Sequence, residues 1–240
     1  MNFGSLFAGI GGFDLGLERA GMKCQWQVEV DDYATKVLEK HWPDVRRYRD
    51  IREVGGDNLE PVELICGGFP CQPFSQAGKR RGKQDDHYLW DQMLRVISEV
   101  RPGWVLGENV VGIVKMELDN VLSDLEGIGY TCQAFCIPAA SVGAWHKRNR
   151  IWICAYSKSI GRFQNQIQSI ISPKMQIWER NQFSELLFAE ALQQAPNGGT
   201  DRNTNGLSTE MDRLKCLGNA VVPQVVEVIG KAIMDCEVIK

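Results

Sequence analysis

Short apolar runs recur along the first 156 residues and alternate with segments in which apolar positions have helical spacing. A short apolar run bounded by glycine or polar residues is typical of a buried strand. We expect strands at residues 2–7, 24–30, 64–67, 104–109, 130–137 and 150–155, and a further short strand that ends at Asp50 and Ile51. Parallel strands buried on both faces show this kind of continuous apolar sequence.

Helices are expected between these strands. The spacing of apolar positions predicts helices over residues 12–20, 32–41, 90–100, 119–128 and 223–234, and Gly21, Pro43 and Gly129 supply stop signals. The alternation of strands and helices predicts an α/β fold, a doubly wound and mostly parallel sheet. We expect the helix that starts at Pro223 to return to the sheet and pack beside the first strand.

The amino-acid composition and periodicity of the sequence change after Tyr156. Residues 157–211 are rich in Gln, Asn and Ser and show little periodicity, apart from a plausible helix at 183–192. We therefore expect three parts, a main domain at 1–156, a small irregular lobe at 157–211 and a C-terminal segment at 212–240 that rejoins the main domain.

Composition narrows the class of protein. The 240 residues are 44% hydrophobic and contain no run long enough to cross a bilayer, and Met1 to Gly4 lacks the basic start of a signal peptide. The eight cysteines form no CxxC pair, so reduced thiols in a cytoplasmic protein are expected, with no metal site. The net charge of −3 does not suggest a nucleic-acid partner, but residues 79–83 and 146–150 are strongly basic. Each cluster alone is best explained as a solvated loop, whereas two clusters at one pocket would form a phosphate-binding surface.

A glycine-rich turn, Phe7-Ala8-Gly9-Ile10-Gly11-Gly12, joins the first strand to the first helix. Glycines at such a turn let a ligand approach the backbone and the free N–H groups of the helix. Glu29 lies 20 residues after Gly9, at the end of the second strand, where a carboxylate commonly binds ribose hydroxyls. Any tight turn could use these glycines, but together with Glu29 they favour nucleoside binding.

Cys71 lies in the segment Phe69-Pro70-Cys71-Gln72-Pro73, directly after a predicted strand and two glycines. This places the thiol on a stiff loop at the carboxyl end of the strand, the edge where ligands bind in open α/β sheets. Structural cysteines usually lie within apolar faces, so Cys71 is a candidate nucleophile.

Glu108 ends another predicted strand and should lie at the same sheet edge as Cys71. Burial there would raise its pKa and suit it to donate a proton or to hydrogen-bond a heterocycle nitrogen. Alone, this residue would be taken for a solvated acid at a strand end.

Together these residues resemble the motifs of the cytosine-C5 DNA methyltransferases, in the family's order. The matching segments are Phe7 to Gly12 (with Phe7, Gly9, Gly11 and Gly12), Glu29, Asp50, Pro70 to Ser75, Glu108 to Val110, His146 to Arg150 and Gly218 to Pro223. The resemblance implies the S-adenosylmethionine-dependent methyltransferase fold. It also implies that the glycine turn, Glu29, Asp50 and Asn219 bind S-adenosyl-L-methionine.

The resemblance also implies a reaction on double-stranded DNA, by a monomer without a membrane partner. The Cys71 thiolate would attack C6 of a flipped cytosine, Glu108 would bind the ring, and C5 would then take the methyl group. Arg148 and Arg150 would support the developing charge. No residue of the sequence stands out as the base that removes the C5 proton.

Departures from the family pattern leave alternatives open. The stretch between Tyr156 and Met211 is short for a target-recognition region, Val30 replaces a common aromatic residue, and His146 replaces a glutamine. A tRNA cytosine-C5 methyltransferase and a non-catalytic DNA-binding derivative are the competing hypotheses. Intact Cys71, Glu108 and Arg150 weigh against the second of these.

Overall fold

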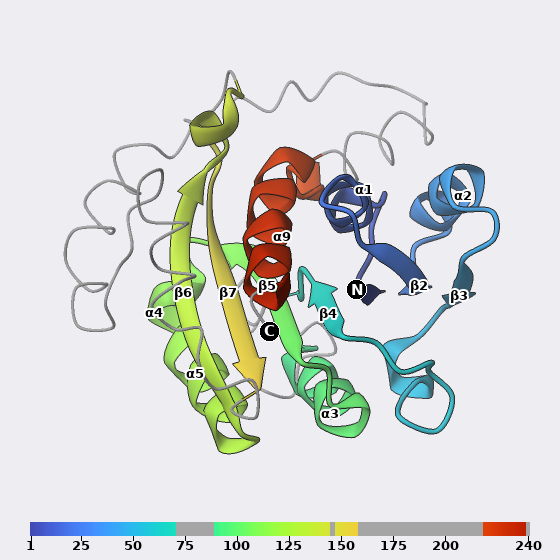
Figure 1. The fold of residues 1–240 in the computed structure, drawn as a ribbon, viewed down its shortest axis with the longest axis horizontal. Coiled ribbons are helices and arrows are strands. Elements are labelled where there is room, and N and C mark those ends of the chain that lie inside the picture. Colours follow the sequence, from blue (N-terminus) through green and yellow to red (C-terminus); the bar gives the residue numbers. More distant parts are fainter. Residues whose placement is uncertain (71–88, 145–146, 158–217, 239–240) are drawn as a thin grey trace, which may run out of the picture.

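The computed structural model describes residues 1–70, 89–144, 147–157 and 218–238. This part of the chain contains a seven-stranded sheet with the strand order β3-β2-β1-β4-β5-β7-β6 (Figure 1). The strands are β1 (Asn2–Leu6), β2 (Lys23–Val28), β3 (Arg46–Tyr48), β4 (Leu64–Gly67), β5 (Trp104–Val110), β6 (Tyr130–Pro138) and β7 (Asn149–Ser157).

Six of the seven strands run in one direction, and only β7 runs against them. The β1–β2, β2–β3, β1–β4 and β4–β5 pairs are parallel, whereas β7 runs antiparallel to both β5 and β6. The prediction of a doubly wound, mostly parallel sheet is confirmed. From β1 the chain first builds outward through β2 and β3 and then starts again on the other side with β4, so the order reverses between β1 and β4. Such a switch point, at the carboxyl ends of the strands, is where open α/β sheets bind ligands.

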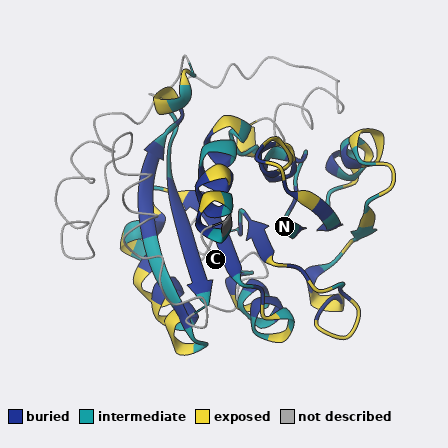
Figure 2. Ribbon diagram, in the orientation of Figure 1, coloured by how far each residue is buried: buried dark blue, intermediate teal, exposed yellow. Residues whose placement is uncertain are grey.

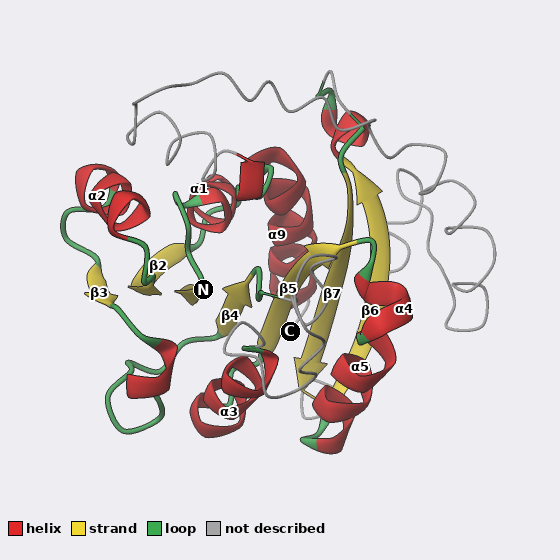
Figure 3. Cartoon of the chain, turned by 180° about the vertical axis from the view of Figure 1, so that it is seen from behind, coloured by secondary structure: helices red, strands yellow, loops and turns green. Residues whose placement is uncertain are grey.

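Helices cover both faces of this sheet. They are α1 (Gly12–Arg19), α2 (Asp32–His41), α3 (Trp90–Val100), α4 (Ile113–Met116), α5 (Leu118–Gly127) and α9 (Pro223–Val238). One core cluster combines apolar residues of α1 and α9 with those of the strands, and a second cluster combines α3 and α5 with the opposite face. Accordingly, α9 lies in front of the sheet in Figure 1 and behind it in Figure 3. The central strand β4 is buried along its whole length (Figure 2).

The last helix returns to the beginning of the chain. Val226 and Ile229 of α9 are buried in the same cluster as Phe3 of β1, as expected from the sequence. The helix also contacts α1 closely, since a Cβ atom built on Gly16 would lie 2.5 Å from Cβ of Val226. Hydrophobic burial against both α1 and the sheet therefore attaches the C-terminal segment to the main domain.

Several element boundaries differ from the sequence-based expectation. The strand expected to end at Asp50 and Ile51 ends at Tyr48, and Ile51–Glu53 is a single 3₁₀ turn because the Asp50 side chain caps it. The last helix continues to Val238 rather than Met234, because Cys236 is buried and Trp104 donates a hydrogen bond to Glu237 (2.9 Å). The expected helix at 183–192 lies outside the described residues.

Candidate active site

The glycine turn after β1 has the backbone geometry that its sequence predicts. Phe7, Gly9 and Gly11 have φ values of 52°, 56° and 87°, in the left-handed region that glycine adopts without strain. Gly11 is the N-cap of α1 and provides no side-chain cap for the first N–H groups of that helix. A Cβ atom on Gly9 would find nothing within 4 Å, so open space borders the turn. The turn can therefore admit a ligand next to its backbone.

Glu29 connects this turn to the end of β2. Its carboxylate accepts hydrogen bonds from the backbone N–H groups of Gly9 (2.7 Å) and Asp31 (2.8 Å). These two bonds hold a half-buried carboxylate beside the turn, with acceptor capacity left for ligand hydroxyls. The sequence-predicted pair of Gly9 and Glu29 is thus brought together.

Asp50 and Asn219 lie at the margin of this region. Asp50 follows β3, accepts a hydrogen bond from the N–H of Arg52 (2.9 Å) and forms an ion pair with its guanidinium (3.6 Å). Asn219 is exposed and lies four residues before α9. The sheet order puts β3 next to β2, so Asp50 continues the carboxyl edge beyond Glu29.

Glu108 is the buried acid of the site. Its side chain forms an ion pair with Arg150, Oε1 to Nε 2.9 Å, and the residue is only 8% exposed. In the β5–β7 register Glu108 faces Trp152 and Val110 faces Arg150, so the two charged residues are diagonal neighbours on one face of the sheet. Burial raises the pKa of Glu108 to about 7, although the positive charges of Arg150 and Arg148 oppose the shift. The expectation of a raised pKa at this position agrees with the geometry.

The segment that leads to Cys71 passes directly beside Glu108. A Cβ atom on Gly68 would lie 3.2 Å from Glu108 Oε2, so the segment passes in close contact with the carboxylate. Asn109 donates a hydrogen bond from Nδ2 to the carbonyl of Phe69 (3.0 Å), and the Phe69 ring packs on Trp90 at 4.9 Å. Cys71 itself, like the basic cluster at 79–83 and His146, lies outside the described residues.

Arg148 has partners that its sequence position does not reveal. Its two terminal nitrogens donate to the carbonyl oxygens of Gly218 (2.9 Å) and Ala220 (2.8 Å). The sequence paired Arg148 with Arg150 as charge-supporting residues, but only Arg150 bonds to Glu108. No local signal could show this, because the partners lie 70 and 72 residues further along the chain.

Sequence reasoning missed a buried polar cluster behind the glycine turn. Asp14 of α1 is fully buried and accepts hydrogen bonds from Ser5 (3.1 Å), Cys24 (3.4 Å) and Gln27 (2.8 Å). Burial raises the pKa of its carboxyl group. The signal was present, since Asp14 follows Phe13 on the side of α1 that the apolar spacing turns inward. The cluster attaches the first turn of α1 to β1 and β2.

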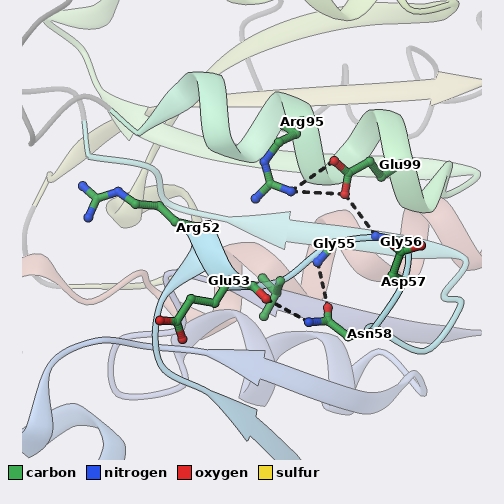
Figure 4. Close-up of a pocket in the computed structure, with 9 residues that line it drawn as sticks. Arg52, Glu53, Gly55, Gly56, Asp57, Asn58, Arg95 and Glu99 are labelled. Carbon is green, nitrogen blue, oxygen red and sulfur yellow. Dashed lines mark hydrogen bonds and ion pairs between the residues drawn. The ribbon is translucent and has the colours of Figure 1, made fainter.

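A separate polar groove lies between the loop before β4 and helix α3 (Figure 4). Its polar groups bond one another, because Glu99 accepts from Arg95 (3.1 Å) and from the N–H of Gly56 (3.1 Å). Asn58 likewise accepts from the N–H of Gly55 (2.9 Å). These bonds connect the loop to α3, so the polar groups of the groove have a structural role. The groove contains none of the predicted site residues.

Two classes of feature are not found in the described part of the chain. No group of three or more His, Cys, Asp or Glu side chains there could hold a metal ion. None of its helices has the length and apolar character needed to cross a membrane.

Comparison with known proteins shows which family the chain belongs to. The model of the C-5 cytosine-specific DNA methylase family matches residues 1–204. The type II methyltransferase M.NgoMIV of Neisseria gonorrhoeae is 33% identical over 170 residues, 68% of this chain and 54% of the relative. M.HhaI of Haemophilus parahaemolyticus is 31% identical over 179 residues, 72% of this chain and 53% of the relative. The chain thus spans about half the length of these two relatives.

Solved structures show the same fold. The Dnmt2 methyltransferase of S. pombe superimposes with a TM-score of 0.58 at 19% identity, over 70% of this chain and 55% of that one. The methyltransferase EhMeth of Entamoeba histolytica gives a TM-score of 0.63 at 14% identity, over 98% of both chains. Structural neighbours of this kind support the S-adenosylmethionine-dependent methyltransferase fold that the motifs imply.

Proposed function

Because the chain belongs to the C-5 cytosine-specific DNA methylase family, we propose that it methylates C5 of cytosine in double-stranded DNA through a covalent Cys71 adduct. One observation carries the proposal. Glu108, buried and paired with Arg150, lies against Gly68, which follows strand β4 at the switch point of the sheet and precedes Cys71 by three residues. Activation of a cytosine ring requires an acid of this kind and a nucleophile, and Cys71 follows Gly68 by three residues in the sequence.

We assign cofactor binding to Phe7, Gly9, Gly11, Gly12, Glu29, Asp50 and Asn219. The open space at Gly9, the N–H groups at the start of α1 and the carboxylate of Glu29 fit a nucleoside-containing ligand. S-adenosyl-L-methionine would supply an electrophilic methyl group there. Asp50 would extend the same edge toward the adenine amino group, as the family motif implies.

Cys71 acts as the nucleophile in this proposal. Its thiolate forms a bond to C6 of the cytosine, which makes C5 nucleophilic, and the bond to sulfur breaks once C5 is methylated and has lost its proton. The thiols of Cys66 and Cys154 are poorly suited to this role, since burial raises the pKa of Cys66 well above its usual range and that of Cys154 to about 12. The Asn109 bond to the Phe69 carbonyl fixes the start of the loop that presents Cys71.

Glu108 and Arg150 serve the base in this proposal. A carboxyl group with a pKa near neutrality can hydrogen-bond N3 and the exocyclic amine of the cytosine as charge builds on the ring. Arg150 holds Glu108 in place and supports the charge near O2 of the base. A target base stacked in a duplex cannot reach these groups, so it must be flipped out. We assign recognition of the DNA sequence to residues 157–211.

The proposal is tested by transfer of a labelled methyl group from S-adenosylmethionine to unmethylated duplex DNA, followed by bisulfite sequencing. We expect methylated cytosine from the wild-type chain and none from Cys71→Ser. Cys132→Ser, which changes a half-buried thiol on β6, is the matched control and should retain transfer. Transfer of the label to tRNA but not to DNA would contradict the proposal. So would transfer by Cys71→Ser equal to that of the wild type.

A further inference from the structure

Arg148 connects two segments that are far apart in the sequence. It lies directly before β7, two residues before Arg150, and its backbone has a φ of 34°, in the left-handed region. Because β7 is antiparallel to its neighbours, its first residues lie at the carboxyl edge of the parallel strands, next to Glu108. From this position the guanidinium bonds the carbonyl oxygens of Gly218 and Ala220 at 2.9 and 2.8 Å.

The segment that Arg148 holds lies directly on the glycine turn. A Cβ atom on Gly12 would be 2.7 Å from the carbonyl oxygen of Val221 and 3.2 Å from its Cβ. Val221 follows Ala220 immediately, so the bond to Arg148 and the contact with Gly12 are made by adjacent residues. A continuous set of contacts therefore runs from the acid Glu108, through Arg150 and the start of β7, to Arg148, the C-terminal segment and the cofactor turn.

We propose that Arg148 is a positioning residue, which presses residues 218–222 onto the glycine turn and thereby sets the affinity for the cofactor. Arg150 alone of the two arginines would then serve the target base. This inference rests on the proposed function, since it gives a role to one side chain in the same site. It gives different roles to Arg148 and Arg150, two neighbouring arginines to which the sequence motif gives the same role.

The two arginines have different kinds of partner. Arg148 bonds two carbonyl oxygens, whereas Arg150 pairs with the carboxylate of Glu108. A guanidinium places two N–H groups in a fixed fork and can reach two carbonyl oxygens at once, whereas an ammonium is a single point of charge. Lysine at residue 148 would keep the positive charge near Glu108 and lose the fork. Its effect should appear where the fork acts, at the C-terminal segment, and not in the chemistry of the base.

The matched variants are Arg148→Lys and Arg150→Lys, which make the same change at two sites only two residues apart. Titration calorimetry with S-adenosylmethionine gives the dissociation constant, and single-turnover methylation at saturating cofactor gives the chemical rate. For Arg148→Lys we expect the dissociation constant to rise about tenfold with the rate within about twofold of wild type. For Arg150→Lys we expect the opposite, a large loss of rate with nearly unchanged cofactor affinity. A loss of rate in Arg148→Lys at unchanged affinity would overturn the inference.

Hydrogen exchange of the amides at 219–222 provides a second test, which does not depend on activity. Without ligand these amides should exchange faster in Arg148→Lys than in wild type, while those of α3 should be unaffected. In the wild type, S-adenosylmethionine should protect them together with the glycine turn. Protection of the turn alone, or equal exchange in both proteins, would overturn the inference. Absence of methyl transfer by the wild type would refute the proposed function, but the exchange comparison without ligand would still test whether Arg148 positions residues 218–222.

Discussion

At Glu108, burial and two arginines act in opposite directions on one carboxyl group. The side chain is almost fully buried, which favours the neutral form, whereas Arg150 at 2.9 Å and the more distant Arg148 favour the carboxylate. The desolvation effect is the larger of the two, and the pKa rises to about 7. Near neutral pH the group can therefore both accept and donate a hydrogen bond.

Replacing Glu108 with Gln should change how the stability of the protein depends on pH. Since the folded-state pKa of about 7 lies above the ordinary value of 4.5, the native state holds a proton that the unfolded chain releases between these pH values. The free energy of unfolding contributed by Glu108 is thus lost as pH rises through this window. Gln stays neutral, so from pH 4 to pH 8 the variant should gain up to about 3 kcal/mol relative to wild type.

Urea unfolding of both proteins at several pH values measures this difference. Glu227→Gln is a suitable control, because Glu227 is paired with Lys231 at the surface of α9 and lies outside the proposed site. Parallel pH profiles for wild type and Glu108→Gln would show that burial does not control this carboxyl group.

Single residues show what the sequence could and could not reveal. Glu108 and Glu29 were identifiable because each lies near the carboxyl end of a recognisable strand, and these ends meet at one edge of the sheet. The role of Arg148 could not be identified from the sequence, because its partners are backbone carbonyls of a distant segment. Asp14 was missed because apolar spacing gives the buried face of a helix but not the polar groups that can be satisfied within it.

At the scale of elements, α1 and α9 approach closely because glycine lies on both sides of their contact. Gly16 of α1 faces Val226 and the carbonyl of Pro223, and Gly230 of α9 faces Ala20 and Leu17. Side chains at these two positions would separate the helices. The close contact keeps the segment before α9 against the cofactor turn.

Gly16→Ala and Gly127→Ala should change stability in opposite directions. The new Cβ at residue 16 would lie 2.5 Å from Cβ of Val226 and 2.6 Å from the Pro223 carbonyl, and such overpacking costs about 1–3 kcal/mol. At Gly127, in the last turn of α5, a Cβ meets nothing within 4 Å, so the better helix propensity of alanine should add up to about 1 kcal/mol. Thermal unfolding of both variants measures the shifts. Equal melting temperatures would contradict the tight α1–α9 contact.

The longer strands and helices were easier to predict than the shortest elements. Apolar runs such as Leu64–Gly67 and Trp104–Val110 are buried on both faces, so burial alone defines them. The short strand β3 depends on pairing with β2, and the helix Ile113–Met116 has only four residues, too few to show a period. Such elements are fixed by tertiary contacts that local sequence does not encode.

At the scale of the whole molecule, the fold is closed by a segment that follows a long stretch of chain. The last residue of β7 is Ser157, and the described chain resumes at Gly218, which bonds to Arg148 at the other end of that strand. The connection between them therefore spans the length of β7, about 30 Å for nine residues. The two sides of the α1–α9 contact lie more than 200 residues apart in sequence, which local reasoning could suggest only through the family motif.

We predict that residues 158–217 are needed for DNA recognition and not for folding of the main domain. A flexible Gly/Ser linker of about 25 residues would span the length of β7 with slack. The variant with this linker should unfold cooperatively and bind S-adenosylmethionine, because α9 packs on α1 and the sheet and Arg148 bonds Gly218 and Ala220. It should neither bind nor methylate duplex DNA. Full-length Cys71→Ser is the control, since it should lose methylation and keep DNA binding. Loss of cooperative unfolding in the linker variant would show instead that the segment belongs to the core.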